Sequence, residues 1–300
     1  MLYRLKVAKV HLTQLKLVLR CFYVDFLVFV LSTKLFFRRK SKENSEANLR
    51  ATLHSIERGF SLAQTRRPFG QKLLEGLEYW RGCLDEEEKN NIVEMYQIGR
   101  KELKDWNNGF GEKPRGDLFG VVAYNSKTIS EGGRRRSVRY YSEHKVPENE
   151  LFEIIERAAN NAPSVCNRQT CRVYLVADED SVSKVLEIQN GNSGMEGAFQ
   201  LLVITSDASC FIDATERNQW AIDGGFFAQS LLMEAHDRGL GTCPLNCSLE
   251  PKSEKKVKEI IGASFSERLI CMISIGNIHL DNVSAFSKKK EIDEFVVTVK

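Results

Sequence analysis

The chain has 300 residues, a net charge of +3 at neutral pH and a hydrophobic fraction of 42%. This length accommodates one large domain or two smaller ones, and the composition is ordinary for a globular protein. A net charge so close to zero argues against a whole-protein basic field for nucleic acid. The eight cysteines form no CxxC pair and no Cys/His quartet, which excludes the common zinc sites. Free thiols of this kind, with no signal-peptide cleavage site after the first apolar stretch, predict a cytoplasmic protein.

Residues 1–40 are basic and apolar, with nine Lys or Arg residues and one acid, Asp25. The uncharged run between Asp25 and Lys34 has eight residues, whereas a membrane-spanning helix needs roughly 20. We therefore expect no simple span. Two interpretations stay open: a segment lying peripherally on an anionic membrane surface, or a helix packed on the rest of the protein or on a second subunit.

Residues 41–133 predict an α-helical region that ends in a connector. Helical periodicity in NLRATLHSIERGFSL is interrupted at AQTRRPFG and resumes in QKLLEGLEYW and in DEEEKNNIVEMYQIGRKELKDW. His54, Glu57 and Arg58 fall within about one helical turn. They form either a site or ordinary surface pairs, of which the second is more common. Residues 107–133 indicate a loop-rich connector.

From residue 134 the pattern changes to helices and short apolar strands. VPENELFEIIERAANNA begins with a proline and acids and continues at helical spacing, and GGFFAQSLLMEAHDRG predicts a buried helix. The predicted strands are RVYLVA (172–177), AFQLLVITSD (198–207) and RLICMISIGN (268–277). Residues 134–300 are therefore expected to form an α+β domain in which helices cover a sheet.

The stretch GGRRRSVRYY, residues 132–141, places four arginines and one serine within six positions. By itself this cluster fits a solvated basic patch, a nucleic-acid or targeting patch, or a grip on one small anion. The later turn APSVCNRQ carries Asn167 and Gln169, whose amides suit hydrogen bonding to a planar heteroaromatic ring. Together the two fit a mononucleotide such as FMN. GLGTCP is not a dinucleotide fingerprint, because its glycines follow a predicted helix instead of a strand.

Five blocks in this order resemble the FMN-dependent nitroreductases over about residues 134–300. They are RRSVRYYSEHKVPENELFEIIERAANNAPSVCNRQ, LLVITSD, AIDGGFFAQSLLMEAHDRGLGTCPLN, MISIGN and AFSKKKEIDEFV. The resemblance implies a nitroreductase-like α+β fold, with a mixed central sheet flanked by helices and a domain-entwined homodimer. LHSIERGFSLAQTRRPFG resembles an α-helical N-terminal extension found in a subset of such proteins, some of them encoded among surface-polysaccharide genes.

The resemblance also implies which residues bind FMN. The first basic block and the tail would hold the phosphate, the PSxxNxQ turn would contact the isoalloxazine, and the segment after GLG would lie against flavin N5. In that order the residues are Arg135, Arg136, Ser137 and Arg139; Lys288 and Lys289; Ser164, Asn167 and Gln169; and Pro244, Leu245, Asn246 and Cys247. The tail has Ser-Lys-Lys-Lys where family members often have Ser-Pro-Arg-Lys, and a lysine keeps the charge but loses the guanidinium fork. Cys247 is expected to be a packing residue.

The activity implied is hydride or electron transfer from NAD(P)H through FMN to an electron-poor small molecule, such as a nitro compound or a quinone. No catalytic side chain is required, because the cofactor carries the chemistry. The alternative is a flavin-binding accessory or sensing protein, linked to surface-polysaccharide biosynthesis, without robust turnover. A nucleic-acid binder is the less favoured reading of the arginine cluster, and we expect no nucleic-acid partner.

Overall fold

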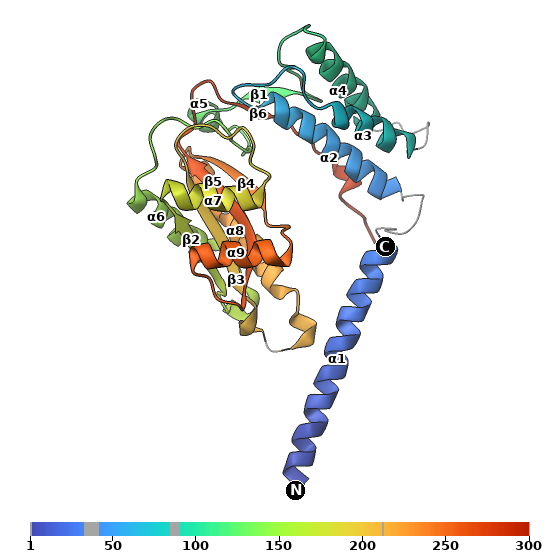
Figure 1. Cartoon of the computed structure of the whole chain (residues 1–300), viewed down its shortest axis with the longest axis vertical. Coiled ribbons are helices and arrows are strands. Elements are labelled where there is room, and N and C mark those ends of the chain that lie inside the picture. The colour runs from blue at the N-terminus through green and yellow to red at the C-terminus, as the bar shows by residue number, and fades with distance from the viewer. Residues whose placement is uncertain (1, 33–41, 85–90, 212, 300) are drawn as a thin grey trace.

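The computed structural model describes residues 2–32, 42–84, 91–211 and 213–299. A sheet domain occupies one part of the molecule, a group of helices lies at one end of its sheet, and a long helix projects as a rod (Figure 1). The helices are α1 (Leu2–Ser32), α2 (Lys42–Phe60), α3 (Gln71–Gly82), α4 (Asn91–Asn107), α5 (Ser126–Ser130), α6 (Glu148–Asn161), α7 (Glu179–Gln189), α8 (Gln219–Asp237) and α9 (Pro251–Ile261). The strands are β1 (Val121–Ala123), β2 (Cys171–Val176), β3 (Gln200–Asp207), β4 (Gly241–Asn246), β5 (Glu267–Gly276) and β6 (Val283–Ala285).

The main sheet has the strand order β2-β3-β5-β4, and each neighbouring pair is antiparallel. A parallel bridge between Ser137 and Thr242 at the edge of β4 makes the sheet mixed. Three of its strands match the predicted ones. β4 is a finding of the structure, since a short run with a proline at its centre has little strand character of its own.

Helices cover both faces of this sheet, as the α+β prediction required. Leu202 and Ile204 of β3 point toward α6 and α8, whereas Leu201 and Val203 join the core that contains side chains of α7 and α9. This alternation follows from the period of two residues along a strand. α6 begins with acids in its first turn and buries Leu151, Ile154 and Ala158 at helical spacing, which confirms the predicted helix.

The helices α2, α3 and α4 form a second hydrophobic core. Along α2, Leu49, Leu53, Ile56 and Phe60 are all fully buried at helical spacing. The helices predicted between residues 41 and 106 therefore occur as α2, α3 and α4. The acidic residues 85–90, with which the last of them was predicted to begin, lie outside the described part of the chain. The three-part division at residues 40 and 133 remains our proposal for the domain organisation.

The expected loop-rich connector before residue 134 contains regular structure. β1 pairs antiparallel with β6, which brings Val121 opposite Ala285 from the C-terminal tail. The tail therefore crosses back to the N-terminal helices. A three-residue strand has too few residues to show a period, so only its distant partner reveals it.

The helix α1 is mostly exposed, and apolar side chains such as Leu19, Phe22 and Phe26 face solvent. Asp25 accepts hydrogen bonds from Nε and Nη2 of Arg217 at 2.6 Å each, which ties the helix to the segment before α8. Within the described residues, no helix combines the length and the apolar character needed to cross a membrane. Residues 33–40 of the predicted basic segment lie outside the described part.

Candidate functional site

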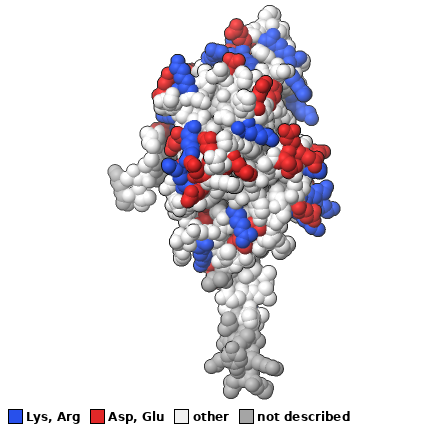
Figure 2. Space-filling view, turned by 90° about the vertical axis from the view of Figure 1, so that its left-hand side faces the viewer, with Lys and Arg blue, Asp and Glu red and all other residues white. Residues whose placement is uncertain are grey.

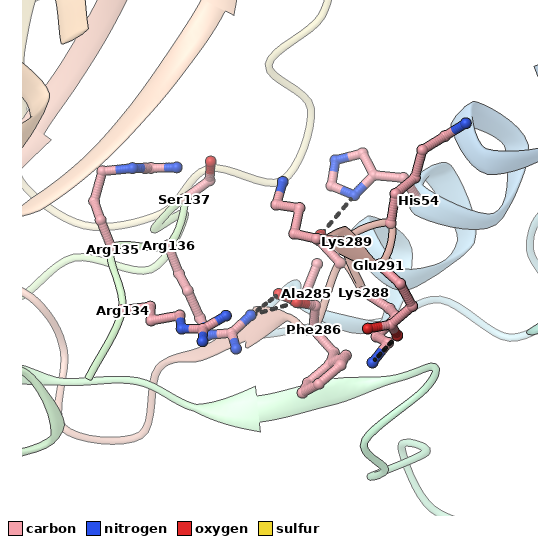
Figure 3. Close-up of a pocket in the computed structure, with 12 residues that line it drawn as sticks. His54, Arg134, Arg135, Arg136, Ser137, Ala285, Phe286, Lys288, Lys289 and Glu291 are labelled. Atoms are coloured by element: carbon pink, nitrogen blue, oxygen red, sulfur yellow. Dashed lines mark hydrogen bonds and ion pairs between the residues drawn. The ribbon is translucent and has the colours of Figure 1, made fainter. Parts of the chain in front are cut away.

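Residues from three separate parts of the chain meet in one pocket of about 520 Å³, which we call the basic pocket. The arginine cluster supplies one wall, the tail after β6 supplies another, and α2 contributes His54 (Figure 3). Six of its side chains are cationic at neutral pH and one is acidic: Arg134, Arg135, Arg136, Lys288, Lys289 and Lys290, with Glu291. The excess of positive charge suits a bound anion.

The arginine cluster is held by the edge of the main sheet. Val138 is fully buried, and its backbone N–H donates to the carbonyl of Thr242 at 2.9 Å. The hydroxyl of Ser284 donates to the carbonyl of Ser137 at 3.0 Å, so β6 also fixes the segment. Because Val138 points into the core, Ser137 beside it is left in the wall of the pocket.

The arginines of the cluster have different surroundings. Nη1 of Arg136 donates to the carbonyls of Ala285, at 2.9 Å, and of Phe286, so this side chain fastens the tail. Nη1 of Arg135 and Nη1 of Arg139 are buried without a hydrogen-bond acceptor in the described part of the molecule. Buried guanidinium donors are costly when unpaired, so an acceptor is expected beside each. The oxygen atoms of a phosphate fit such donors.

Arg139 differs from its neighbours because it does not line the basic pocket. Its side chain is buried, and its charge lies near Arg58 of α2. Burial, with the charge of Arg139 as a second cause, lowers the pKa of the Arg58 guanidinium. Arg58 and Arg139 both lie outside the lining of the basic pocket. No carboxylate of the described residues is ion-paired with either of them.

The tail turns sharply as it enters the pocket. Ser287 has a φ of 53°, a left-handed conformation that is uncommon outside glycine, and Lys288 and Lys289 follow it. Lys288 is paired with Glu291 at 3.0 Å, which lowers the pKa of that carboxyl. Lys289 has no ion pair within the described residues, and in Figure 3 its side chain extends toward Ser137.

The predicted amide turn precedes β2. Cys166, Asn167 and Gln169 have φ values of 49°, 54° and 50°, and such clusters of left-handed residues are frequent at ligand sites. The hydroxyl of Ser164 accepts from the backbone N–H of Gln169 at 3.0 Å. The Gln169 amide donates to Asn167 Oδ1 at 3.1 Å, and both side chains are exposed.

The buried carboxylate of Asp223 in α8 supports the same turn. It accepts from the backbone N–H of Val165 at 3.1 Å and from the amide of Gln219 at 2.8 Å. Asp223 is only 1% exposed, so this contact fixes the turn to the start of α8. The sequence reasoning missed this residue, since its role depends on a contact across 58 positions.

The amide turn and the basic pocket lie at opposite ends of the main sheet. Thr242, beside the arginine cluster, is level with Ile275 of β5. Cys171, directly after the amide turn, is level with Ser206, which pairs with Arg268 at the other end of β5. β2 and β4 are also opposite edges of the sheet. One chain therefore does not bring Ser164, Asn167 and Gln169 to the arginines.

The segment after GLG runs along the edge strand β4. Pro244 and Asn246 are exposed, whereas Leu245 is buried in the core on the opposite side of the strand. Cys247 packs against the same core, and burial raises the pKa of its thiol to about 12. A thiol with this pKa is protonated near neutral pH, which fits the expected packing role.

Charges of both signs are interspersed on the face of the molecule that Figure 2 presents. This mixture differs from the surface of one sign that follows a nucleic-acid backbone. The described helix α1 is largely free of charge on this side (Figure 2).

Residues 133–277 match the sequence model of a known family, the Nitroreductase family. A protein of Archaeoglobus fulgidus, provisionally named NADH dehydrogenase/NAD(P)H nitroreductase, is 23% identical over 142 residues, which cover 47% of this chain and 80% of the relative. An NADH dehydrogenase of Thermus thermophilus is 39% identical over 74 residues, or 25% of this chain and 36% of the relative. A crystal structure from Exiguobacterium sibiricum, described provisionally as a nitroreductase in complex with FMN, has 18% identity and a TM-score of 0.48. That alignment covers 59% of this chain and 99% of the solved one.

Proposed function

Because residues 133–277 match the Nitroreductase family, we propose that the chain is an FMN-dependent NAD(P)H oxidoreductase. The single observation that carries the FMN assignment is the buried, unpaired Nη1 atom of Arg135 in the wall of the basic pocket. Five further cationic side chains and one acidic side chain line this pocket. A terminal phosphate supplies the acceptor that this donor lacks.

In this proposal Arg135, Ser137 and Lys289 bind the phosphate, and Arg136 keeps the tail in place through the carbonyls of Ala285 and Phe286. Arg139 supplies positive charge from a buried position outside the lining of the pocket. Bound FMN would supply hydride transfer at N5, from NAD(P)H to an electron-poor small molecule. The free thiols of the described cysteines support a cytoplasmic location.

The ring of the cofactor is proposed to lie against the amide turn of a second copy. The two groups of residues are separated along β5 by the distance from Arg268 to Ile275, which is about 24 Å at 3.4 Å per residue. The five-carbon ribityl chain of FMN spans less than about 10 Å at bond lengths near 1.5 Å. A homodimer that places Ser164, Asn167 and Gln169 of one chain near the pocket of its partner resolves this mismatch.

Exposed apolar side chains on α8 support the dimer. Ile222 and Phe226 are each 49% exposed and Met233 is 39% exposed, although they lie on a helix inside residues 133–277, which match the family. A contiguous apolar patch of this kind is typical of an interface. Pro244, Leu245, Asn246 and Cys247 line the sheet edge that we assign to the N5 side of the flavin.

The visible spectrum of the purified chain tests the cofactor. We expect a yellow protein whose released flavin is FMN, and oxidation of NADH or NADPH in the presence of a quinone or a nitroaromatic. A colourless protein that cannot be reconstituted with FMN would overturn the assignment. Bound FMN without measurable turnover would instead indicate the accessory or sensing role.

A further inference from the structure

The helix α2 lies outside the segment that matches the family, yet it reaches the basic pocket. Two of its residues within one turn, His54 and Glu57, face the tail. Neither is needed to explain the packing of α2, which buries Leu53 and Ile56 instead.

Glu57 fixes the tail where it enters the pocket. Its side chain is only 1% exposed, and its carboxylate accepts from the backbone N–H of Gly120 at 3.1 Å and of Ser287 at 3.3 Å. Gly120 precedes β1, and Ser287 follows β6, so one carboxylate holds the two segments that pair as a small sheet. A charged acceptor strengthens both contacts.

His54 makes a second contact with the same turn. A hydrogen bond of 3.0 Å joins His54 Nδ1 to the hydroxyl of Ser287, and the ring forms part of the pocket wall (Figure 3). The left-handed Ser287 is therefore held through both its backbone and its side chain. This turn directs Lys288 and Lys289 into the pocket.

We propose that α2 is a wall of the phosphate site, in which His54 and Glu57 position the lysine-bearing tail. This rests on the proposed function, because the phosphate is that of FMN. The cofactor site of this chain then extends beyond residues 133–277, which match the family. The helix α2 is in that case required for full FMN affinity.

The test compares FMN with riboflavin, which lacks the phosphate, in the full-length apo-protein. Flavin fluorescence titrations give both dissociation constants, and their ratio reports the phosphate contribution. We expect His54→Ala and Glu57→Gln each to lower the preference for FMN by about tenfold, while riboflavin affinity stays within about twofold.

Glu57→Gln gives the sharpest result, because it removes a negative charge near the phosphate. A simple charge effect would raise the preference for FMN, whereas loss of the positioned tail lowers it. Matched controls are Glu94→Gln on the exposed side of α4 and His144→Ala, also exposed, and both should leave the ratio unchanged.

The outcomes separate the two proposals. If the wild-type chain binds neither flavin, the proposed function fails and this inference fails with it. If the wild-type chain prefers FMN and both α2 variants keep that preference, the inference alone is overturned. Thermal unfolding by circular dichroism, together with retained riboflavin binding, shows that each variant is folded.

Discussion

The arginine cluster illustrates how neighbouring identical residues acquire separate roles. In an extended segment, Arg135, Ser137 and Arg139 are expected on one face, with Arg136 and Val138 on the other. The burial of Val138 agrees with that alternation, whereas Arg136 lines the basic pocket together with Arg135 and Ser137. Arg139 departs from it in part, since its side chain is buried behind the pocket instead of lining it.

Arg135→Ala should weaken FMN binding about ten- to a hundredfold, and Arg139→Ala should weaken it less, because the Arg139 side chain lies outside the lining of the pocket. Loss of one charge-assisted contact with a buried phosphate costs about 1.5–3 kcal/mol. Arg134→Ala should have little effect, because this arginine is exposed at the rim of the pocket. Titration of the apo-protein with FMN measures all three. Equal damage from Arg134→Ala and Arg135→Ala would contradict the assignment.

Cysteine labelling provides a second test at this scale. Burial raises the pKa of Cys171 to about 11 and the pKa values of Cys247 and Cys271 to about 12, so these thiols stay protonated at pH 8. Iodoacetamide reacts with thiolates, and we expect it to modify the exposed Cys83 and Cys166 well before these three. Peptide mass spectrometry over a time course gives the order. Rapid labelling of Cys247 would show that it is not a packing residue.

At the scale of elements, α1 and α2 differ in what they contact. α1 contacts the rest of the described chain chiefly near Asp25 and Arg217. Figure 1 shows it projecting away from β1 and β6. α2 packs beside β6 and contributes His54 to the pocket wall. Both helices precede residue 133, where the match to the family begins, but of the two only α2 contributes a side chain to the basic pocket.

Removal of residues 1–40 should therefore leave FMN binding intact. We expect the flavin spectrum and the dissociation constant for FMN to stay the same, and solubility or association with anionic vesicles to change. Removal of residues 1–133 is the contrasting variant, since it deletes His54 and Glu57. If a chain without residues 1–40 folds but no longer binds flavin, the prediction that this segment is not needed for FMN binding is wrong.

At the scale of the whole molecule, the proposed cofactor site needs a second copy, because the basic pocket and the amide turn lie at opposite ends of the main sheet. We expect a stable homodimer at micromolar concentration, with residues around 222–233 of α8 in the interface. Light scattering gives the mass, and Phe226→Glu should shift it toward the monomer by placing a charge on the apolar patch. A wild-type, flavin-loaded monomer would rule the dimer out.

Subunit mixing tests whether each site is shared between two chains. Arg135→Ala and Gln169→Ala alter residues at opposite ends of the sheet, so each homodimer has two damaged sites. In an equal mixture, half of the dimers combine both variants and hold one intact site, which restores about a quarter of the wild-type FMN sites. Bound FMN after co-expression measures this. No recovery beyond the separate homodimers would place each site within one chain.

The helices and strands with a clear period could be predicted from the sequence. The face of α6 with Leu151 and Ile154, and the apolar run of β5, depend on neighbours within a few residues, and local pattern carries that information. The resemblance to a family predicted that the arginine cluster and the lysine-bearing tail lie together, and both line the basic pocket, whereas the cluster by itself fitted three kinds of site.

Contacts between distant segments were decided by the tertiary structure. β4 is a strand because the edge of β5 is open to it, β1 exists through its pairing with β6, and the bond from His54 to Ser287 spans 233 positions. The order β2-β3-β5-β4 separates the amide turn from the arginines, although both stand in one continuous stretch of sequence. No local pattern encodes strand order, since that order is set by which apolar faces can be buried together once the whole chain has folded.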